Sequence, residues 1–420
     1  MSISKIKPAE RVSNFSRDVW SIFTPLALET KAINLGQGFM NFPPPAVVQN
    51  ACKEALDKVE ANQYCHPKGL LRLRKALAAS YQKEFNCREL DPETNIIVTA
   101  GANEGIFASL AGFLDKGDEV IVIEPFFDQY IPNITMNGGV PVYVPLRPPT
   151  DADQRVVSSS EWTLDINELE SKITEKTKLM IINTPHNPVG KVFNEQELNA
   201  IGQVAEKYNL LIISDEVYDR LYYPPHERIP RIANSFWDRT ITVGSAGKSF
   251  SATGWRIGWL IGPAELIQHA YAAQLRVVFC VNSPCQEAVA TGLEVSLTQP
   301  LFQQQIEDYI EKRAILSKVF DQLQLPYTVP EGSYFILVNT SKIQIPQDYI
   351  FPELLEDRGD DFKMCYWLTK EIGVCAIPPS EFYMKDHWPL ASKYARFAFC
   401  KTNDVLEQAV DRLKQLEKYI

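Results

Sequence analysis

The stretch LLIISDE, residues 210–216, indicates the class of fold that this chain adopts. It begins with an uninterrupted apolar run and ends in the polar residues Ser214, Asp215 and Glu216. A strand with apolar residues on both faces is typical of a parallel sheet that helices cover on both sides. In open sheets of this class, ligand-binding groups lie at the carboxyl ends of the strands, which is where we expect Asp215.

Similar apolar runs recur through the middle of the chain and alternate with longer amphipathic segments. The segments 103–115 and 195–208 are predicted helices, and Asn194 with Glu197 indicates a capped start for the second one. This alternation predicts an α/β fold with a mainly parallel sheet. The other predicted strands are NIIVTAG at 95–101, DEVIVIEP at 118–125, VPVYVP at 140–145, KLMIINTP at 178–185 and RTITVGS at 239–245.

The pattern changes after about residue 300, and the rest of the chain predicts a smaller α+β domain. A long charged helix at 303–323 leads to EGSYFILVN, a helix near 362–372, the strand YARFAFCK and a terminal helix. PQDYIFPELLEDRGDD at 346–361 indicates a long surface insertion. We therefore predict a large cofactor-binding domain at 50–300, and a small domain formed by 1–49, which includes an N-terminal arm, and 301–420.

Composition excludes several classes of function. Hydrophobic residues make up 45% and charged residues 22% of the 420 residues, the balance of a soluble globular protein. The net charge of −10, with both signs mixed along the chain, argues against nucleic acid or an anionic membrane as a partner. The eight cysteines form no CxxC pair and the five histidines are dispersed, so we expect no metal site and reduced thiols.

The N-terminal segment bears on where the protein works. Its first twenty residues combine lysine and arginine with Glu10 and Asp18, and they lack the apolar core of a secretory signal. We predict a cytoplasmic protein and leave open a mitochondrial location, because a transit peptide is not excluded.

SAGKSFSATGWRIGW, residues 245–259, places a single lysine, Lys248, among small side chains. A solvated surface lysine is one interpretation. A P-loop is another, but Thr242 stands where GxxxxGK[ST] needs its first glycine. The third is a lysine that forms a Schiff base with pyridoxal phosphate, since small neighbours let the cofactor lie against the backbone and Ser245 and Arg256 suit its phosphate.

A pyridoxal phosphate site requires further residues around the cofactor ring. Residues at the ends of other predicted strands can supply them. A buried carboxylate must keep the ring nitrogen protonated, and Asp215 is placed for this role. Tyr218 and Asn187 could meet the phenolic oxygen of the ring, and Phe127 in EPFFDQY could stack on it. Taken singly, each of these residues has a purely structural interpretation: Asp215 as a helix cap, Tyr218 and Phe127 as core aromatics, and Asn187 as a turn residue. Taken together, they favour one cofactor-binding site.

The phosphate needs a helix N-terminus with free backbone amides. VTAGANEGIFASL supplies it, because a strand leads through Gly101, Ala102 and Asn103 directly into a helix.

In the order and spacing of NTPHNPVGKVF, SDEVYDRL, SAGKSFSATGWRIGW and YARFAFCK, nearly the whole chain resembles the class I/II aminotransferases. The resemblance implies that the chain is a pyridoxal-phosphate enzyme of fold type I. This fold has a mainly parallel seven-stranded sheet in a large domain and a smaller α+β domain. It also implies pyridoxal 5'-phosphate as cofactor and a homodimer. Within the family, INLGQGFMNFPPP, EPFFDQYIPN and EGSYFILVN resemble the kynurenine aminotransferase subgroup of fungal type, also called glutamine transaminase K or cysteine-S-conjugate β-lyase.

The resemblance also implies a role for each site residue. It assigns Lys248 to the Schiff base, Asp215 to the ring nitrogen, and Tyr218 and Asn187 to the phenolic oxygen. The phosphate cup consists of Ser245, Arg256 and the amides of Ala102 and Asn103, with Tyr64 of NQYCHPKG reaching in from the other subunit.

For the substrate, the resemblance assigns Arg396 to the α-carboxylate, assisted by Asn187 and the backbone of Gly36. Trp20 matches an aromatic residue of the side-chain pocket. Two departures lie near the substrate: GQGFMNFPPP replaces the usual GQGFPD, and Asn103 stands where many relatives carry an aromatic residue.

The implied reaction is transfer of the amino group of L-kynurenine, or of another aromatic or uncharged amino acid, to a 2-oxo acid such as 2-oxoglutarate. Kynurenate forms after cyclisation, and the kinetics are ping-pong. The alternatives within the fold are a β-lyase, a decarboxylating member or another transaminase, because one fold hosts many reactions. A regulator that binds the cofactor without turnover usually carries an added DNA-binding domain, which we do not find in this sequence.

Overall fold

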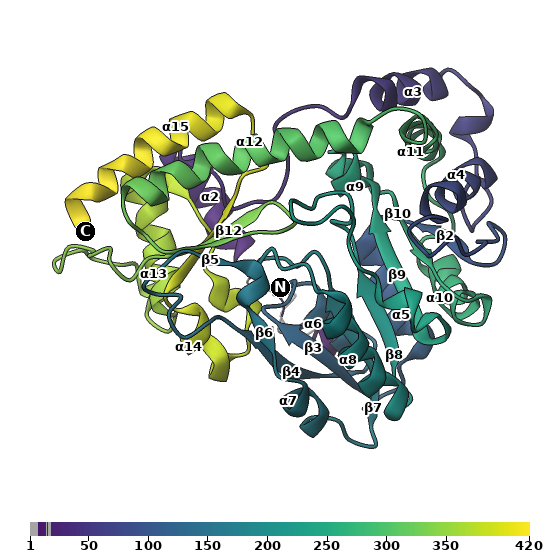
Figure 1. Ribbon diagram of the computed structural model, residues 1–420, viewed down its shortest axis with the longest axis horizontal. Coiled ribbons are helices and arrows are strands. Elements are labelled where there is room, and N and C mark those ends of the chain that lie inside the picture. The colour runs from purple at the N-terminus through teal and green to yellow at the C-terminus, as the bar shows by residue number, and fades with distance from the viewer. Residues whose placement is uncertain (1–6, 14, 16–17) are drawn as a thin grey trace, which may run out of the picture.

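A large sheet forms the centre of the computed structural model, which describes residues 7–13, 15 and 18–420 (Figure 1). Residues 1–6, 14, 16 and 17 of the predicted N-terminal arm lie outside the described residues, so the prediction about a transit peptide falls partly outside them as well. In the described chain the sheet has eight strands, of which those at its centre run parallel. In spatial order the strands are β2 (Ile96–Thr99), β10 (Gly258–Ile261), β9 (Thr240–Ser245), β8 (Leu211–Asp215), β7 (Thr177–Asn183), β3 (Glu119–Glu124), β4 (Val140–Arg147) and β6 (Thr163–Leu164).

The six strands predicted from their apolar runs are confirmed within a few residues at their ends. β10 was not predicted; it pairs antiparallel with both β9 and β2, because the chain returns to the sheet through the short lysine loop without a helical crossover. β6 pairs antiparallel with β4 and gives the described sheet one strand more than the seven that the resemblance implied. It pairs with Leu146 and Arg147 at the end of β4 and so covers part of the edge of the sheet.

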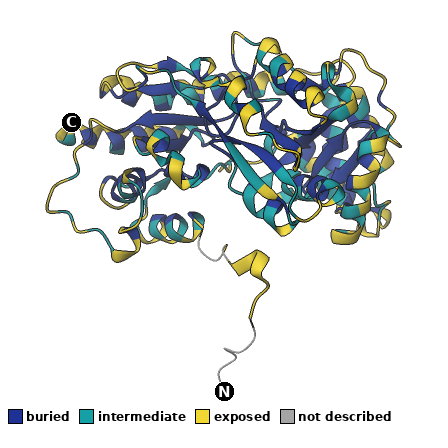
Figure 2. Cartoon of the chain, turned by 90° about the horizontal axis from the view of Figure 1, so that it is seen from below, coloured by how far each residue is buried: buried dark blue, intermediate teal, exposed yellow. Residues whose placement is uncertain are grey.

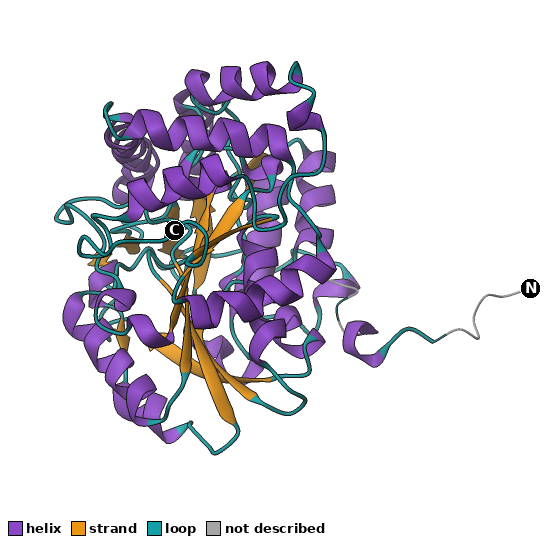
Figure 3. Cartoon of the chain, turned by 90° about the vertical axis from the view of Figure 1, so that its right-hand side faces the viewer, coloured by secondary structure: helices purple, strands orange, loops and turns teal. Residues whose placement is uncertain are grey.

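Helices cover both faces of this sheet, as the continuous apolar runs predicted (Figure 3). Along β7, Leu179 and Ile181 belong to one buried cluster, whereas Met180 and Ile182 belong to another. α5 (Ala102–Phe113) contributes to the first cluster and α8 (Glu195–Lys207) to the second. The predicted capping box of α8 is confirmed by reciprocal hydrogen bonds between Asn194 and Glu197. The other helices of this part are α3 (Ala46–Leu56), α4 (Leu71–Tyr81), α6 (Tyr130–Met136), α7 (Ile166–Ser171), α9 (Ala246–Ser249), α10 (Ala264–Val277) and α11 (Ser283–Ser296).

A second sheet lies beside the first and has the order β14–β12–β11–β5 in the described residues. The long helix α12 (Leu301–Gln322) and α15 (Asn403–Leu413) lie over it in Figure 1 and pack together. Figure 2 shows most of the strand residues of both sheets buried, with exposed residues on the outer faces of the helices. The strands are β5 (Val157–Ser158), β11 (Tyr327–Val329), β12 (Phe335–Asn339) and β14 (Tyr394–Ala398); the remaining elements are α1 (Glu10–Ser13), α2 (Trp20–Thr30), α13 (Asp360–Trp367), α14 (Trp388–Ala391) and the parallel pair β1 (Ile33–Asn34) and β13 (Val374–Cys375).

The second sheet agrees with the predicted α+β character of the C-terminal part. The predicted helix near 362–372 is formed by α13 and a π-helical turn that continues it. Residues 346–361 lie mostly at the surface, with Leu355 and Asp361 buried. β5 belongs to this sheet although it lies within the range predicted for the large domain, so the domain boundaries stay a prediction.

None of the described helices combines the length and the apolar character needed to cross a membrane.

Candidate active site

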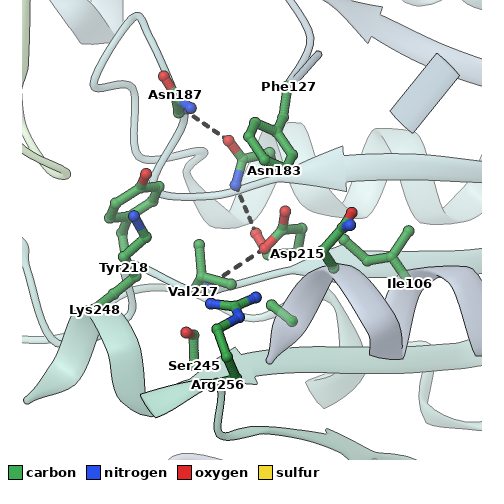
Figure 4. A pocket seen from close by; sticks show the side chains of 12 residues that line it. Ile106, Phe127, Asn183, Asn187, Asp215, Val217, Tyr218, Ser245, Lys248 and Arg256 are labelled. Atoms are coloured by element: carbon green, nitrogen blue, oxygen red, sulfur yellow. Dashed lines mark hydrogen bonds between the residues drawn. The ribbon is translucent and has the colours of Figure 1, made fainter. Parts of the chain in front are cut away.

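A pocket lies where the carboxyl ends of β7, β8 and β9 meet the N-terminus of α5 (Figure 4). It holds about 600 Å³ of space, counted to its open mouth, which suits a cofactor together with a small substrate. Every residue predicted to bind the cofactor lines it, except Gly101 and Tyr64. The lining residues are Ala102, Asn103, Ile106, Phe127, Asn183, Asn187, Asp215, Val217, Tyr218, Ser245, Lys248 and Arg256.

Lys248 extends from α9, which begins directly after β9. Its Nζ donates to Tyr334 Oη at 2.6 Å and to the carbonyl oxygen of Gly38 at 3.3 Å. Burial of the amine lowers the pKa of Lys248 to about 8. A share of the lysine is therefore neutral near pH 7, and only the neutral amine can act as a nucleophile or a base.

Tyr334 is a site residue that the sequence did not reveal. It lies in the quoted stretch EGSYFILVN, and its hydroxyl donates to Gly38 at 2.7 Å while accepting from Lys248. Its ring also meets the ring of Tyr218 edge-on, with 5.2 Å between the centroids. Tyr334 thus joins Lys248 to the wall of the pocket, but nothing in the local pattern distinguishes it from a core aromatic.

Asp215 ends β8 with only 4% of its surface exposed. Burial raises the pKa of its carboxyl group to about 6. Its carboxylate accepts hydrogen bonds from the hydroxyl of Tyr130 and, at 3.3 Å, from the amide of Val217. These partners are neutral, so a protonated ring nitrogen would supply the positive charge that a buried carboxylate favours.

Asn183, at the end of β7, fixes the two neighbouring segments of the site. Its side-chain amide donates to the carbonyl oxygen of Asp215 at 2.8 Å, and its side-chain oxygen accepts from the amide of Asn187 at 2.7 Å (Figure 4). Asn183 and Tyr130 were not predicted as site residues, although both lie in quoted stretches and Asn183 ends its strand.

The start of α5 forms a cup for an anion. No side chain caps this helix, so the amides of its first turn, including that of Ala102, are available to a ligand. Gly101 has a φ of +84°, and a Cβ atom there would lie 2.3 Å from Nη2 of Arg256, so only glycine fits beneath the guanidinium. Ser245 ends β9 and lines the same pocket. This set of donors around one cationic group fits a phosphate monoester.

Arg396 approaches the pocket from β14 of the second sheet. It is 2% exposed, and its guanidinium donates to the carbonyl oxygen of Gly36 at 2.8 Å and to Oδ1 of Asn187 at 3.2 Å. Gly36 and Asn187 therefore hold the arginine in this structure. The amide of Gly36 donates to Oδ1 of Asn34 at 3.1 Å, so this amide is engaged within the chain.

Aromatic rings surround this guanidinium in place of acidic partners. Its carbon lies 4.4 Å from the ring centre of Phe335, 4.7 Å from that of Phe382 and 5.7 Å from that of Trp20. Burial lowers the pKa of Arg396 to about 10. Among the described residues no carboxylate forms an ion pair with it, and such a buried cation is a strong site for a carboxylate ligand.

The structure does not bring Tyr64 to this pocket. Its side chain is 85% exposed, and its ring lies edge-on against Phe279 with 5.5 Å between centroids. The loop that carries Tyr64 points toward solvent, so within one chain this tyrosine has no role at the pocket.

The family and its relatives agree with this geometry. The model of class I and II aminotransferases matches residues 30–413, and the chain belongs to this family. Enzymes of the family depend on pyridoxal phosphate and act on amino acids and oxo acids.

The chain is 48% identical to the Saccharomyces cerevisiae protein named "Probable kynurenine–oxoglutarate transaminase BNA3", across 97% of this chain and 94% of that protein. It is 41% identical to the kynurenine–oxoglutarate transaminase of Dictyostelium discoideum, across 98% and 97% of the two chains. The crystal structure of Bna3p from Saccharomyces cerevisiae superposes with a TM-score of 0.95 at 47% identity, covering 99% of both chains.

His186, next to Asn187, should make the protein sensitive to acid. It is 1% exposed, and burial together with the Lys191 cation lowers its pKa from 6.5 to about 3. Below pH 6.5 the unfolded chain binds a proton that the folded chain does not, so stability falls as the pH falls. The free energy of unfolding should therefore fall between pH 7 and pH 5 in the unchanged protein. In His186→Gln this fall should be smaller by about 2 kcal/mol.

Urea unfolding at a fixed protein concentration across this pH range measures the effect. The exposed His66 provides the control variant, His66→Gln, measured in the same way. Equal pH slopes for the unchanged protein and His186→Gln would contradict the prediction.

Proposed function

We propose that this protein transfers the amino group of L-kynurenine, and of other aromatic or uncharged amino acids, to a 2-oxo acid such as 2-oxoglutarate. Pyridoxal 5'-phosphate is the cofactor and occupies the pocket beside Lys248. The observation that carries the proposal is the buried Arg396, which lacks an acidic partner in the described chain and lies among aromatic rings 5.7 Å or less from its guanidinium. The names of the yeast and Dictyostelium relatives support the substrate.

The residues of the pocket divide the chemistry between them. Bound pyridoxal phosphate would supply an electron sink for the pair left at the substrate α-carbon. Lys248, with its lowered pKa, takes and returns the α-proton, and Asp215 holds the proton on the ring nitrogen. The cup at Gly101 and Arg256 holds the phosphate in both half-reactions, so a second substrate can restore the starting state.

A panel of amino donors and oxo-acid acceptors on the cofactor-loaded protein tests this function. Kynurenine, phenylalanine and glutamine should exceed aspartate in kcat/KM by at least about tenfold, because the one arginine that lines the described pocket, Arg256, belongs to the phosphate cup and no second arginine there is left for a distal carboxylate. If aspartate were the best donor, the substrate class would be wrong although amino transfer would stand. Release of ammonia and pyruvate from a cysteine S-conjugate, without amino transfer, would favour the β-lyase alternative.

We also propose a homodimer in which Tyr64 completes the phosphate site of the partner. Tyr64 and Phe279 are 85% and 51% exposed, and such a pair of aromatic rings at the surface is typical of an interface. Light scattering should give twice the chain mass of 47.6 kDa, and Tyr64→Ala should weaken cofactor binding. A monomeric protein with full activity would contradict this proposal. The cytoplasmic location, with its mitochondrial alternative, stays a prediction.

A further inference from the structure

Two acceptors, the hydroxyl of Tyr334 and the carbonyl group of Gly38, hold the amine of Lys248. The Nζ atom lies 2.6 Å from Oη of Tyr334 and 3.3 Å from the oxygen of Gly38. The two acceptors are joined to each other as well, because the hydroxyl of Tyr334 donates to the carbonyl of Gly38 at 2.7 Å. These three groups therefore form a closed triangle of hydrogen bonds at the end of the lysine side chain.

The hydroxyl of Tyr334 accepts from the lysine and donates to the backbone. Its side chain is fully buried, and burial raises the pKa of Tyr334 well above its ordinary value, so the hydroxyl keeps its proton. A phenol has one proton to donate, which Gly38 accepts, and the oxygen is left to accept from Lys248. Tyr334 and Gly38 thus each engage one N–H of the lysine amine.

Packing fixes the position of the Tyr334 ring. A Cβ atom at Gly38 would lie 2.9 Å from Cε2 of this ring, so the segment that carries Gly38 is in close contact with it. Tyr309 stacks on the ring with 6.1 Å between the centroids and an angle of 20°, and Tyr218 meets it edge-on at 5.2 Å. A ring that is held on several sides places its hydroxyl at a defined point beside the lysine.

We infer that Tyr334 is a positioning residue that orients the lone pair of the Lys248 amine for proton transfer. The inference rests on the proposed function, in which Lys248 takes and returns the α-proton. A neutral primary amine has two N–H bonds and one lone pair. When Tyr334 and Gly38 engage both N–H bonds, the lone pair points away from these two acceptors, and Lys248 lines the pocket beside Tyr218 (Figure 4).

Without the hydroxyl of Tyr334, the amine turns more freely about its Cε–Nζ bond. The lone pair then has the productive direction for a smaller share of the time, and proton transfer slows although the lysine is still present. Tyr334→Phe removes one oxygen atom and leaves the surrounding charges unchanged. The charged and titratable groups that face the amine are Arg256, Arg396, Asp215 and Cys400.

The first measurement uses the full-length chain from which any cofactor has been removed. Competitive labelling with acetic anhydride at several pH values, followed by peptide mass analysis, reports the pKa of the Lys248 amine. In Tyr334→Phe the charged amine loses an acceptor, so this pKa should fall below its value of about 8 in the unchanged protein. The neutral share of Lys248 near pH 7 should therefore rise.

The second measurement uses the cofactor-loaded protein. The half-reaction with phenylalanine, followed by the absorbance of the cofactor, gives a limiting rate and a dissociation constant for the donor. In Tyr334→Phe the limiting rate should fall at least about tenfold. The dissociation constant should change by less than about threefold, because Arg396 is unchanged. A larger neutral share of the lysine together with slower proton transfer distinguishes lost orientation from lost basicity.

Tyr309→Phe is the matched control. This tyrosine is also fully buried and packs on the ring of Tyr334, but its hydroxyl has no hydrogen bond to Lys248 within the described chain. The pKa of Lys248 and the limiting rate should both stay as in the unchanged protein.

A limiting rate in Tyr334→Phe within about twofold of the unchanged protein, or equal losses in the two variants, would overturn the inference. Absence of amino transfer in the unchanged protein would instead refute the proposed function. In that case the labelling of the cofactor-free chain would still decide whether Tyr334 holds the amine, since an unchanged pKa of Lys248 in Tyr334→Phe would contradict that contact.

Discussion

Lys248→Ala should lower amino transfer by at least about a thousandfold while pyridoxal phosphate still binds without a covalent link. Lys248 is the only lysine that lines the described pocket, so no other lysine amine there can replace it as the base. The anion cup at Gly101 and Arg256 and the carboxylate of Asp215 are unchanged, so the contacts that hold the cofactor persist. Reduction with borohydride followed by peptide mass analysis should attach the cofactor to Lys248 in the unchanged protein and to no residue in the variant.

Lys178 provides the control for this experiment. It lies at the opposite end of β7 with 48% of its side chain exposed, and Lys178→Ala should keep both covalent attachment and activity. Attachment to another lysine, or a loss of less than tenfold in Lys248→Ala, would refute the assignment of the catalytic lysine.

Arg396→Ala should weaken every amino-acid donor, whatever its side chain. The buried guanidinium is held by Gly36 and Asn187, and its Nε has no hydrogen-bond partner among the described residues, so donor capacity remains for a carboxylate ligand. Removing one partner of a buried charged pair costs about 2–5 kcal/mol, or about thirty- to several-thousandfold in kcat/KM. The ratio of phenylalanine to aspartate should hardly change, because Arg396 binds the group that all donors share. Steady-state kinetics with both donors measure this effect.

Arg396→Lys separates charge from geometry. Lysine keeps the charge, but it cannot make the two parallel hydrogen bonds of a guanidinium, so it should recover only a small part of the activity. If Arg396→Lys restored full kcat/KM, charge alone would suffice. A loss confined to one class of side chain would place Arg396 in the side-chain pocket instead.

The six predicted strands of the large sheet were predictable because the apolar run within each segment by itself indicates a buried strand. β8 and β7 are apolar on both faces, and each ends at a polar residue that faces the pocket. β10 was missed because its four residues follow the lysine loop directly, so its antiparallel return has no separate pattern. Asp215 and Lys248 were predictable for a related reason: the ends of parallel strands meet at one edge of the sheet.

The residues that orient these groups could not be predicted in the same way. Tyr334 contacts Lys248 from 86 positions away, and Tyr130 contacts Asp215 from 85 positions away. Such contacts depend on how separate segments pack, and periodicity along one segment contains no information about them. The role of Tyr64 depends on a second chain, so it stays a prediction.

Because Arg396 lies on the second sheet, the residues proposed for the reaction and those proposed to hold the substrate come from different parts of the fold. Lys248 and Asp215 belong to the large sheet, whereas Arg396 lies on β14 and Trp20 on α2. The groups proposed to carry out the reaction and the groups proposed to hold the substrate thus come from different layers. We therefore expect mutations in α2, which carries Trp20, to change which amino acids are accepted while the residues for amino transfer on the large sheet stay unchanged, so that α2 is a target for laboratory evolution.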